Sequence, residues 1–561
     1  MKIPSRSDLI VLLMLLCSTI ITSQESQGEG IQLSGFLSTH IESYSVSGIE
    51  ERRPAYSYLL SGNLALSYRD FSVPISFNYR DAQFSYDYTF NRYGISPTYK
   101  WATLHLGWRN MRFSPYTMSG RSFYGVGIEL KPGLLSFSIM HGEVQNPLAI
   151  RDSLQFGASL IPIYDRKIMG TKLGFGNRKN KVEFIAMKVW DDENSFQYNE
   201  SYNDTYSYLS FTPKENILGG INFSVSPTRS LRIYGNSGLS AITQDINDPT
   251  TDAVSGSIPD GIQDIIVLNT SSTISVAGDI GVNYFFKGTR LGLKWKRIGS
   301  FYTTLASNYF PNDLEQVSIN FGTSLLNRKL SLSSDIGVEK NNLSGYRLNT
   351  TRRLIGNATL NFTTSSSYYA NLRYANYQTD SETDIINLSD TLRFISTTQQ
   401  LGFFTGYKIN GQSRDLSFSG SIFYNTVTDQ STIERLGDIH ILSLNGSTSL
   451  LLKDSGISII PTIHYYRYTY DDIIQNRYGG GLKSSISLLD KKIKTSVSTT
   501  YSYNDYNDRN DGYSSNTTLN FTYQISQLGS ISLLSTYRIS DSILQENFTE
   551  WRNRMRFTQR I

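Results

Sequence analysis

The chain has 561 residues, a formal net charge of +4, 18% charged residues and 13% aromatic residues. So small a net charge gives no reason to expect nucleic acid as a partner. The combination of 38 tyrosines and 28 phenylalanines with a mean hydropathy of −0.29 fits poorly with an ordinary globular core. It favours a surface that is apolar on one side and wet on the other.

The first 23 residues predict a secretory signal peptide, and 24–561 is the predicted mature barrel. Lys2 and Arg6 supply a positive start, 9–16 is an unbroken apolar run, and Ser23 is the small residue at the expected cleavage point. The run is too short to predict a membrane-spanning helix, and no later segment reaches the length that one needs.

Cys17 is the only cysteine and lies inside this leader. The mature chain is therefore expected to fold without disulfide bonds. A lipidated Cys17 is the alternative, but the bulky Leu16 stands where a small residue is expected.

Alternation of apolar and polar residues is the main structural signal. Within 274–286 every second residue is apolar or glycine, and the residues between are mostly small or polar; 416–424 and 519–525 repeat the pattern. Successive side chains of a strand point to opposite faces, so these segments predict two-faced β-strands. Tilted strands of roughly 9–11 residues cross a bilayer.

The connections between the predicted strands alternate in length along the chain. Short turns are expected at 131–133, 176–181, 227–229, 287–288, 327–329, 453–456, 490–492 and 526–529. Long loops are expected at 43–55, 109–122, 144–167, 191–217, 243–270, 299–315, 339–354, 378–392, 427–437, 504–513 and 541–549, with 470–476 long only by comparison. This rhythm predicts a single all-β, antiparallel, up-and-down transmembrane barrel of about 26 strands, with about 24 as the alternative.

The last strand carries a row of arginines. Trp551, Met555, Phe557 and Ile561 share one face, and the other face holds Arg552, Arg554, Arg556 and Arg560. Four arginines facing lipid would be costly, so this row is expected to face the lumen. Two interpretations stay open: a positive stripe that favours anionic solutes, or structural pairing with carboxylates such as Asp279.

The leader, the alternating strands, the unequal connections and the apolar terminal strand together resemble the large outer-membrane β-barrel proteins of Gram-negative bacteria. The resemblance implies an outer-membrane location with both termini in the periplasm. It also implies contact with outer-membrane lipid and lipopolysaccharide, and insertion by the barrel-assembly machinery. The barrel is expected to be plug-less and porin-like, since alternation already begins at Ile31. The segments 91–97 and 125–133 resemble a part of bacterial barrels to which no activity is attached.

The predicted loop 144–167 is unusually apolar for an external connection. We expect it to fold into the lumen as a constriction or to dock an envelope protein partner, because so apolar a loop should not stay in water. An extra hairpin on the rim is the alternative. The residues that carry this prediction are Leu148, Ile150, Phe156, Ile161 and Tyr164.

No motif indicates catalysis, a cofactor or a metal. The five histidines accompany no recognisable nucleophile motif, and the acidic loop 504–513 fails the EF-hand spacing. The leading hypothesis is therefore a channel for polar solutes. The alternative is a non-conducting barrel that scaffolds a surface or secretion complex, and a barrel enzyme is the third possibility.

Overall fold

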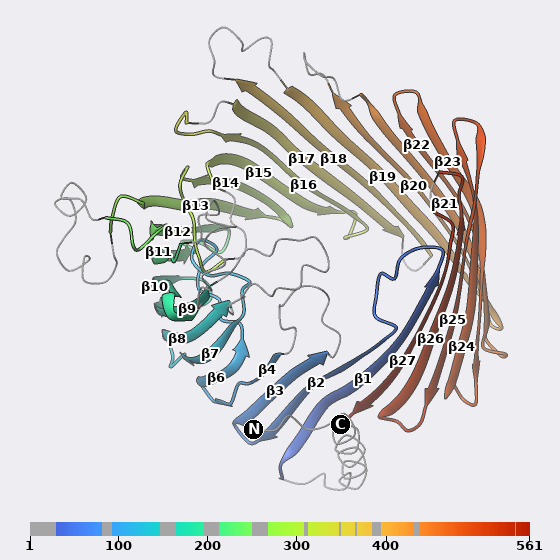
Figure 1. Ribbon diagram of the computed structural model, residues 1–561, viewed down its shortest axis with the longest axis horizontal. Coiled ribbons are helices and arrows are strands. Elements are labelled where there is room, and N and C mark those ends of the chain that lie inside the picture. Colours follow the sequence, from blue (N-terminus) through green and yellow to red (C-terminus); the bar gives the residue numbers. More distant parts are fainter. Residues whose placement is uncertain are drawn as a thin grey trace, which may run out of the picture.

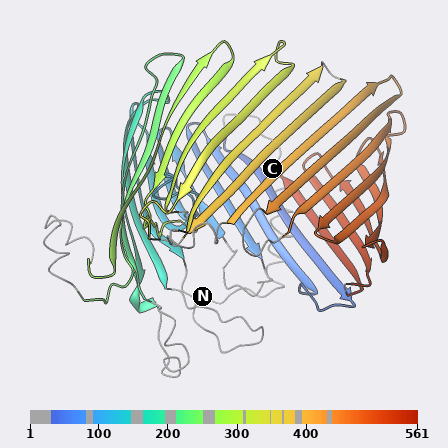
Figure 2. The ribbon, with the colours of Figure 1, turned by 90° about the horizontal axis from the view of Figure 1, so that it is seen from above.

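The computed structural model describes residues 30–80, 92–145, 164–195, 212–249, 268–307, 312–346, 349–364, 367–383, 394–429, 437–544 and 546–561. The predicted signal peptide, 1–23, lies outside these residues. The described strands form one antiparallel sheet that closes on itself, because β1 (Gln32–Ser47) pairs both with β2 (Tyr56–Tyr68) and with the last strand, β27 (Phe548–Arg560). Figure 1 shows the resulting ring, and Figure 2 shows its strands inclined to the barrel axis.

The strands of the first half are mostly short. They are β3 (Phe71–Arg80), β4 (Arg92–Ile95), β5 (Thr98–Tyr99), β6 (Ala102–Arg109), β7 (Phe123–Leu130), β8 (Leu135–Gln145), β9 (Asp165–Gly176), β10 (Lys181–Asp192), β11 (Glu215–Val225), β12 (Leu231–Thr243), β13 (Ser272–Phe286) and β14 (Thr289–Ile298).

The strands of the second half are longer, up to 17 residues in β19. They are β15 (Leu314–Leu325), β16 (Leu330–Asn341), β17 (Asn349–Thr364), β18 (Tyr368–Thr383), β19 (Phe394–Asn410), β20 (Arg414–Asp429), β21 (Ile439–Leu452), β22 (Ile457–Tyr470), β23 (Ile473–Leu488), β24 (Ile493–Tyr506), β25 (Arg509–Gln524) and β26 (Gly529–Asp541).

The predicted count of 26 strands is confirmed. The sheet contains 27 strand segments, but β4 and β5 both pair with β3 and with β6, so together they make one crossing of the wall. Ser96 and Pro97 separate the two, and proline interrupts a ladder because it has no backbone N–H to donate. The all-β barrel class is confirmed with it.

The outer face of the barrel is apolar, as the alternation predicts. Val276, Ile280 and Val282 on β13 are 62%, 44% and 37% exposed, although water would disfavour such exposure of large apolar side chains. Aromatic side chains gather near the ends of the strands, among them Tyr68, Phe71, Tyr99 and Trp101 at one end and Tyr424, Tyr478, Tyr537 and Trp551 at the other. An apolar band between two aromatic girdles is the surface of a barrel that spans a membrane.

The short turns are confirmed, but two predicted loops are wrong. The connection expected at 470–476 is a two-residue turn, because β22 ends at Tyr470 and β23 begins at Ile473. The other is the predicted loop 504–513. β24 continues to Tyr506 and β25 begins at Arg509, so only Asn507 and Asp508 turn the chain. Both have positive φ, 48° and 59°, which matches a tight hairpin turn of type I′. Asn and Asp tolerate this conformation, and the polar composition that suggested a loop belongs to a hairpin.

Helices play almost no part. The described residues hold one short 3-10 helix, η1 (Glu193–Ser195), and none that is long and apolar enough to cross a membrane.

Candidate functional site: a barrel interior with a filled side and a polar side

The connection between β6 and β7 folds into the barrel interior, although the sequence indicated only an external loop. We call residues 110–122 the inner segment. Met111, Phe113 and Met118 are 2%, 3% and 0% exposed. Locally, Thr117 N donates to Ser114 O, which closes a turn around Pro115, and Phe113 N donates to Met118 O at 3.2 Å. This hairpin-like path presents the three apolar side chains to the wall.

The inner segment docks because the wall beside it is apolar on both faces. Met140, Ile168, Met187, Val189, Leu218 and Ile242 project from β8 to β12 into one cluster with Met111, Phe113 and Met118, and each is at most 3% exposed. Water does not reach these side chains. Full burial of each such side chain contributes about 1.5–3 kcal/mol, so packing holds the segment in place.

Two glycines make room for the docked segment. A Cβ at Gly127 of β7 would collide with the Met111 sulfur. A Cβ at Gly238 of β12 would lie 2.6 Å from the Tyr116 Cβ. Neither glycine has a positive φ, so their role here is to let two chain segments approach closely.

A second connection, between β14 and β15, lies against the inner segment. Tyr302 Oη donates to Tyr116 O at 2.5 Å, and Thr304 Oγ1 donates to Thr117 O at 2.9 Å. Arg121, 8% exposed, donates to the backbone oxygens of Val144 and Leu305 at 2.9 and 3.1 Å. These bonds satisfy backbone groups that burial would otherwise leave unpaired.

Tyr116 ties the inner segment to the far side of the filled sector. Its hydroxyl donates to Asp279 Oδ1 on β13 at 2.8 Å, and Asp279 also accepts from Asn236 Nδ2 at 3.2 Å. Lys294 Nζ lies 3.6 Å from the same carboxylate. Burial, reinforced by the hydrogen bond to Asp279, raises the pKa of Tyr116, so the phenol stays protonated and continues to donate.

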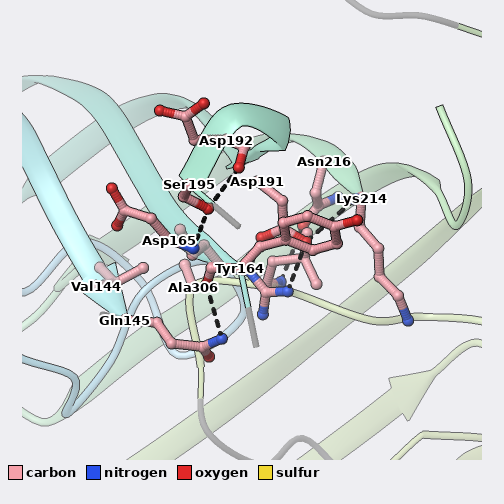
Figure 3. Close-up of polar contacts among 12 residues, drawn as sticks. Val144, Gln145, Tyr164, Asp165, Asp191, Asp192, Ser195, Lys214, Asn216 and Ala306 are labelled. Carbon is pink, nitrogen blue, oxygen red and sulfur yellow. Dashed lines mark hydrogen bonds and ion pairs between the residues drawn. The ribbon is translucent and has the colours of Figure 1, made fainter. Parts of the chain in front are cut away.

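The rim of the filled sector is held by a polar cluster at the ends of β8 to β11 (Figure 3). Arg166 binds the buried carboxylate of Asp191 with two hydrogen bonds of 2.7 and 3.0 Å, and Lys214 N donates to the same group at 3.1 Å. The Ser195 hydroxyl accepts from Asp165 N at 2.9 Å and donates to Asp192 O at 2.6 Å. A bidentate, desolvated ion pair at this position joins neighbouring strand ends.

Tyr164, one of the predicted constriction residues, belongs to this rim. It is 6% exposed, and its carbonyl oxygen accepts from Gln145 Nε2 at 3.4 Å. Leu148, Ile150, Phe156 and Ile161 lie outside the described residues. Tyr164 is thus buried at the rim, while the inner segment, which the sequence did not indicate as a constriction, supplies the apolar filling.

The opposite wall, from β20 to β27, has a polar inner face. Ser419, Ser421 and Asn445 share it, with Ser419 Oγ bonded to Ser447 Oγ at 2.6 Å and Asn445 Nδ2 donating to Ser421. Further along, Thr500 pairs with Asn516, which pairs with Arg538, and all three are exposed. The inner side chains here are reached by water, unlike those of β8 to β12.

The arginine row on β27 lies on the face opposite to the exposed Trp551 and Met555. Arg552 makes two hydrogen bonds of 2.8 Å to Glu42 on β1, and Arg554 makes two of 3.1 and 3.0 Å to Glu42 Oε2. The carboxylate that meets the row is therefore Glu42, across the seam that closes the barrel, whereas Asp279 binds Tyr116. Arg556 donates to Ser38 Oγ at 3.1 Å, and Arg560 is exposed.

Three of the five histidines lie within hydrogen-bond distance of serine hydroxyls. His105 Nδ1 lies 3.0 Å from Ser96 Oγ, and His464 Nε2 lies 2.8 Å from Ser502 Oγ. No group of three or more histidine, cysteine, aspartate or glutamate side chains is arranged for a metal ion among the described residues.

No protein-family model and no curated protein sequence matches the chain. Solved structures that resemble it include the translocation pore of the P pilus usher PapC, at 10% identity over 95% of this chain and 100% of that one, with a TM-score of 0.37. A mutant ferric enterobactin receptor, PfeA, from Pseudomonas aeruginosa is 11% identical over 95% and 81% of the two chains, with a TM-score of 0.40. OprD of the same bacterium is 11% identical over 71% and 95%, with a TM-score of 0.30.

Similarities this distant carry no argument about what the chain does. The class follows from the closed strand pairing and the apolar outer face. The chain forms a large, closed β-barrel of the membrane-spanning kind.

Proposed function

We propose that the barrel is an outer-membrane channel for polar solutes, whose aqueous path follows the polar inner wall of β20 to β27. The observation that carries the proposal is the contrast between the two sides of the interior. Inner side chains of β8 to β12 are buried under the inner segment, whereas Thr500, Asn516 and Arg538 stand exposed on the facing wall. A barrel of 26 strands is far wider than its side chains can fill.

The inner segment and the β14–β15 connection reduce this width from one side only. Hydrogen bonds from Tyr302, Thr304 and Arg121 join the two to each other. Apolar packing and the bonds from Arg121 to Val144 and from Tyr116 to Asp279 fix the inner segment to the wall. They act as a static lining that narrows the path, and the serine, threonine and asparagine groups of the other wall replace the water shell of a passing polar solute.

The test is single-channel recording of the purified, refolded protein in a planar bilayer with a salt gradient. Stable, uniform conductance steps support the proposal, and the reversal potential gives the charge preference. Silence from protein that migrates as a folded barrel on a gel would contradict it and favour the non-conducting scaffold.

A further inference from the structure

The polar wall contains two cavities that meet in one groove. The first, of about 400 Å³, is lined by Thr500, Ser502, Ser514, Ser515, Asn516, Thr536, Arg538, Glu550 and Arg552. The second, of about 200 Å³, continues from it through the shared Ser514 and Arg538 to Arg477, Asp505, Asp511 and Tyr466. The groove therefore crosses the inner face from β22 to β27.

The groove carries charge of both signs in equal number. Arg477, Arg538 and Arg552 line the groove together with Asp505, Asp511 and Glu550. With three guanidinium groups and three carboxylates in its lining, and Arg552 also paired with Glu42, the groove has little net field and no strong reason to concentrate ions of either sign.

The groove is rich in hydrogen-bonding groups of complementary geometry. Guanidinium and carboxylate groups are planar and present two donors or two acceptors side by side. An amide presents one donor and one acceptor, and the hydroxyls of Thr500 and Ser514 serve as either. Vicinal hydroxyl groups of a sugar ring match such paired sites. Tyr466, 36% exposed at one end, adds an aromatic surface against which the C–H face of a sugar can pack.

Arg538 lines both cavities. Its guanidinium lies 5.2 Å from the centre of the Phe548 ring, which the guanidinium of Arg52 also approaches at 5.4 Å. It makes no hydrogen bond to another residue in the described part of the chain, whereas Arg552 is engaged by Glu42. Arg538 thus offers donors at the junction of the two cavities.

From these features we propose that the groove between β22 and β27 binds a neutral oligosaccharide during its passage. This rests on the proposed channel function for the water-filled path, but the groove is a separate claim with its own test.

The experiment is current block of the full-length barrel by three probes: maltohexaose, trigalacturonate and inorganic phosphate. We expect maltohexaose to block the open channel reversibly and more tightly than the two anions. Block by both anions with none by the neutral sugar would overturn the saccharide assignment in favour of an anion site. Block by none of the three would overturn the site while leaving the channel function intact.

The variant Arg538→Gln should weaken the maltohexaose block roughly tenfold, because it removes charge-assisted hydrogen bonds. Arg373→Gln is the matched control, since Arg373 is an exposed arginine on β18, outside the groove. If Arg538→Gln does not fold, the block is measured instead on Thr500→Val, a second change within the first cavity. Equal block by wild type, Arg538→Gln and Thr500→Val would contradict the proposal.

If the protein does not conduct, the channel function fails, and titration calorimetry of maltohexaose against the detergent-solubilised barrel tests the groove directly. Binding that Arg538→Gln weakens and Arg373→Gln does not would then support the groove alone. Absence of binding would overturn it.

Discussion

The filled side and the polar side of the barrel interior are built from the same kind of strand. Both present an apolar outer face, shown by Phe184 on β10 and Ile422 on β20, which are 53% and 48% exposed. They differ in the alternate residues: Met187 and Val189 point inward on β10, while Ser419 and Ser421 do so on β20. The type of inward residue thus decides whether the interior is packed by chain or open to water.

The largest effect is expected from removing the apolar anchors of the inner segment. Met111→Ser, Phe113→Ser and Met118→Ser together should undock it, since each loses about 1.5–3 kcal/mol of burial. The denaturant midpoint of the folded barrel should fall, and the conductance step should grow or fluctuate. Arg112→Ser with Ser119→Ala alters exposed positions of the same segment and should change neither. Unchanged stability and conductance in the triple variant would show that packing does not hold the segment.

A smaller effect is expected from filling the space under the segment. Gly238→Ala places a methyl against Tyr116 and Tyr302 and should destabilise the barrel by about 1–3 kcal/mol, the usual cost of overpacking. Gly219→Ala is the control, because its Cβ would meet only Leu239 Cβ at 4.0 Å. Chemical unfolding of both variants gives the comparison, and equal midpoints would mean that the close approach at Gly238 is not required.

The hydrogen bond between Tyr116 and Asp279 is expected to contribute less. Tyr116→Phe should cost about 1–2 kcal/mol, because a buried carboxylate loses one of its donors. Adding Asp279→Asn should recover part of that loss, so the two changes should not be additive in a double-mutant cycle. Strict additivity of the two unfolding free energies would indicate that the pair does not interact.

The smallest effect on stability is expected at the seam. Glu42→Gln removes the carboxylate shared by Arg552 and Arg554, but these groups are partly exposed, and solvent screening limits the loss to about 1 kcal/mol or less. The reversal potential should move toward anion preference, because guanidinium charge is uncovered. Glu339→Gln on β16, whose carboxylate lies 3.4 Å from Arg353, tests the same change away from the seam. An equal shift of the reversal potential in both variants would show that the charge at the seam has no particular role in ion preference.

The alternation and the turn residues were sufficient to predict the barrel, its strand count and most short turns. They failed at 504–513 because Asn507 and Asp508 suit both a solvated loop and a two-residue hairpin turn, and pairing between the flanking strands decides. Long-range pairing also decided the partner of the arginine row, since Glu42 and Arg552 are 510 positions apart.

The inner segment was missed for a related reason. Its partners, from Met140 to Ile242, lie on strands that the sequence cannot place next to it. One signal was present: Ile168 and Met169 are adjacent apolar residues, and β9 therefore departs from strict alternation. Apolar residues on both faces of a strand indicate that both faces are buried. The loop 144–167 was expected to fold into the lumen because it is too apolar to stay in water. The same expectation applies to Met111, Phe113 and Met118.

The contrast between the two sides is tested most directly by cysteine labelling in liposomes with a membrane-impermeant maleimide. A Cys17→Ser background removes the only native cysteine. Met118→Cys, at a position that is 0% exposed, should stay unlabelled until the barrel is unfolded, while Asn516→Cys on the exposed wall should label at once. Rapid labelling of both positions, or protection of Asn516→Cys, would contradict a barrel that is filled on one side and open on the other.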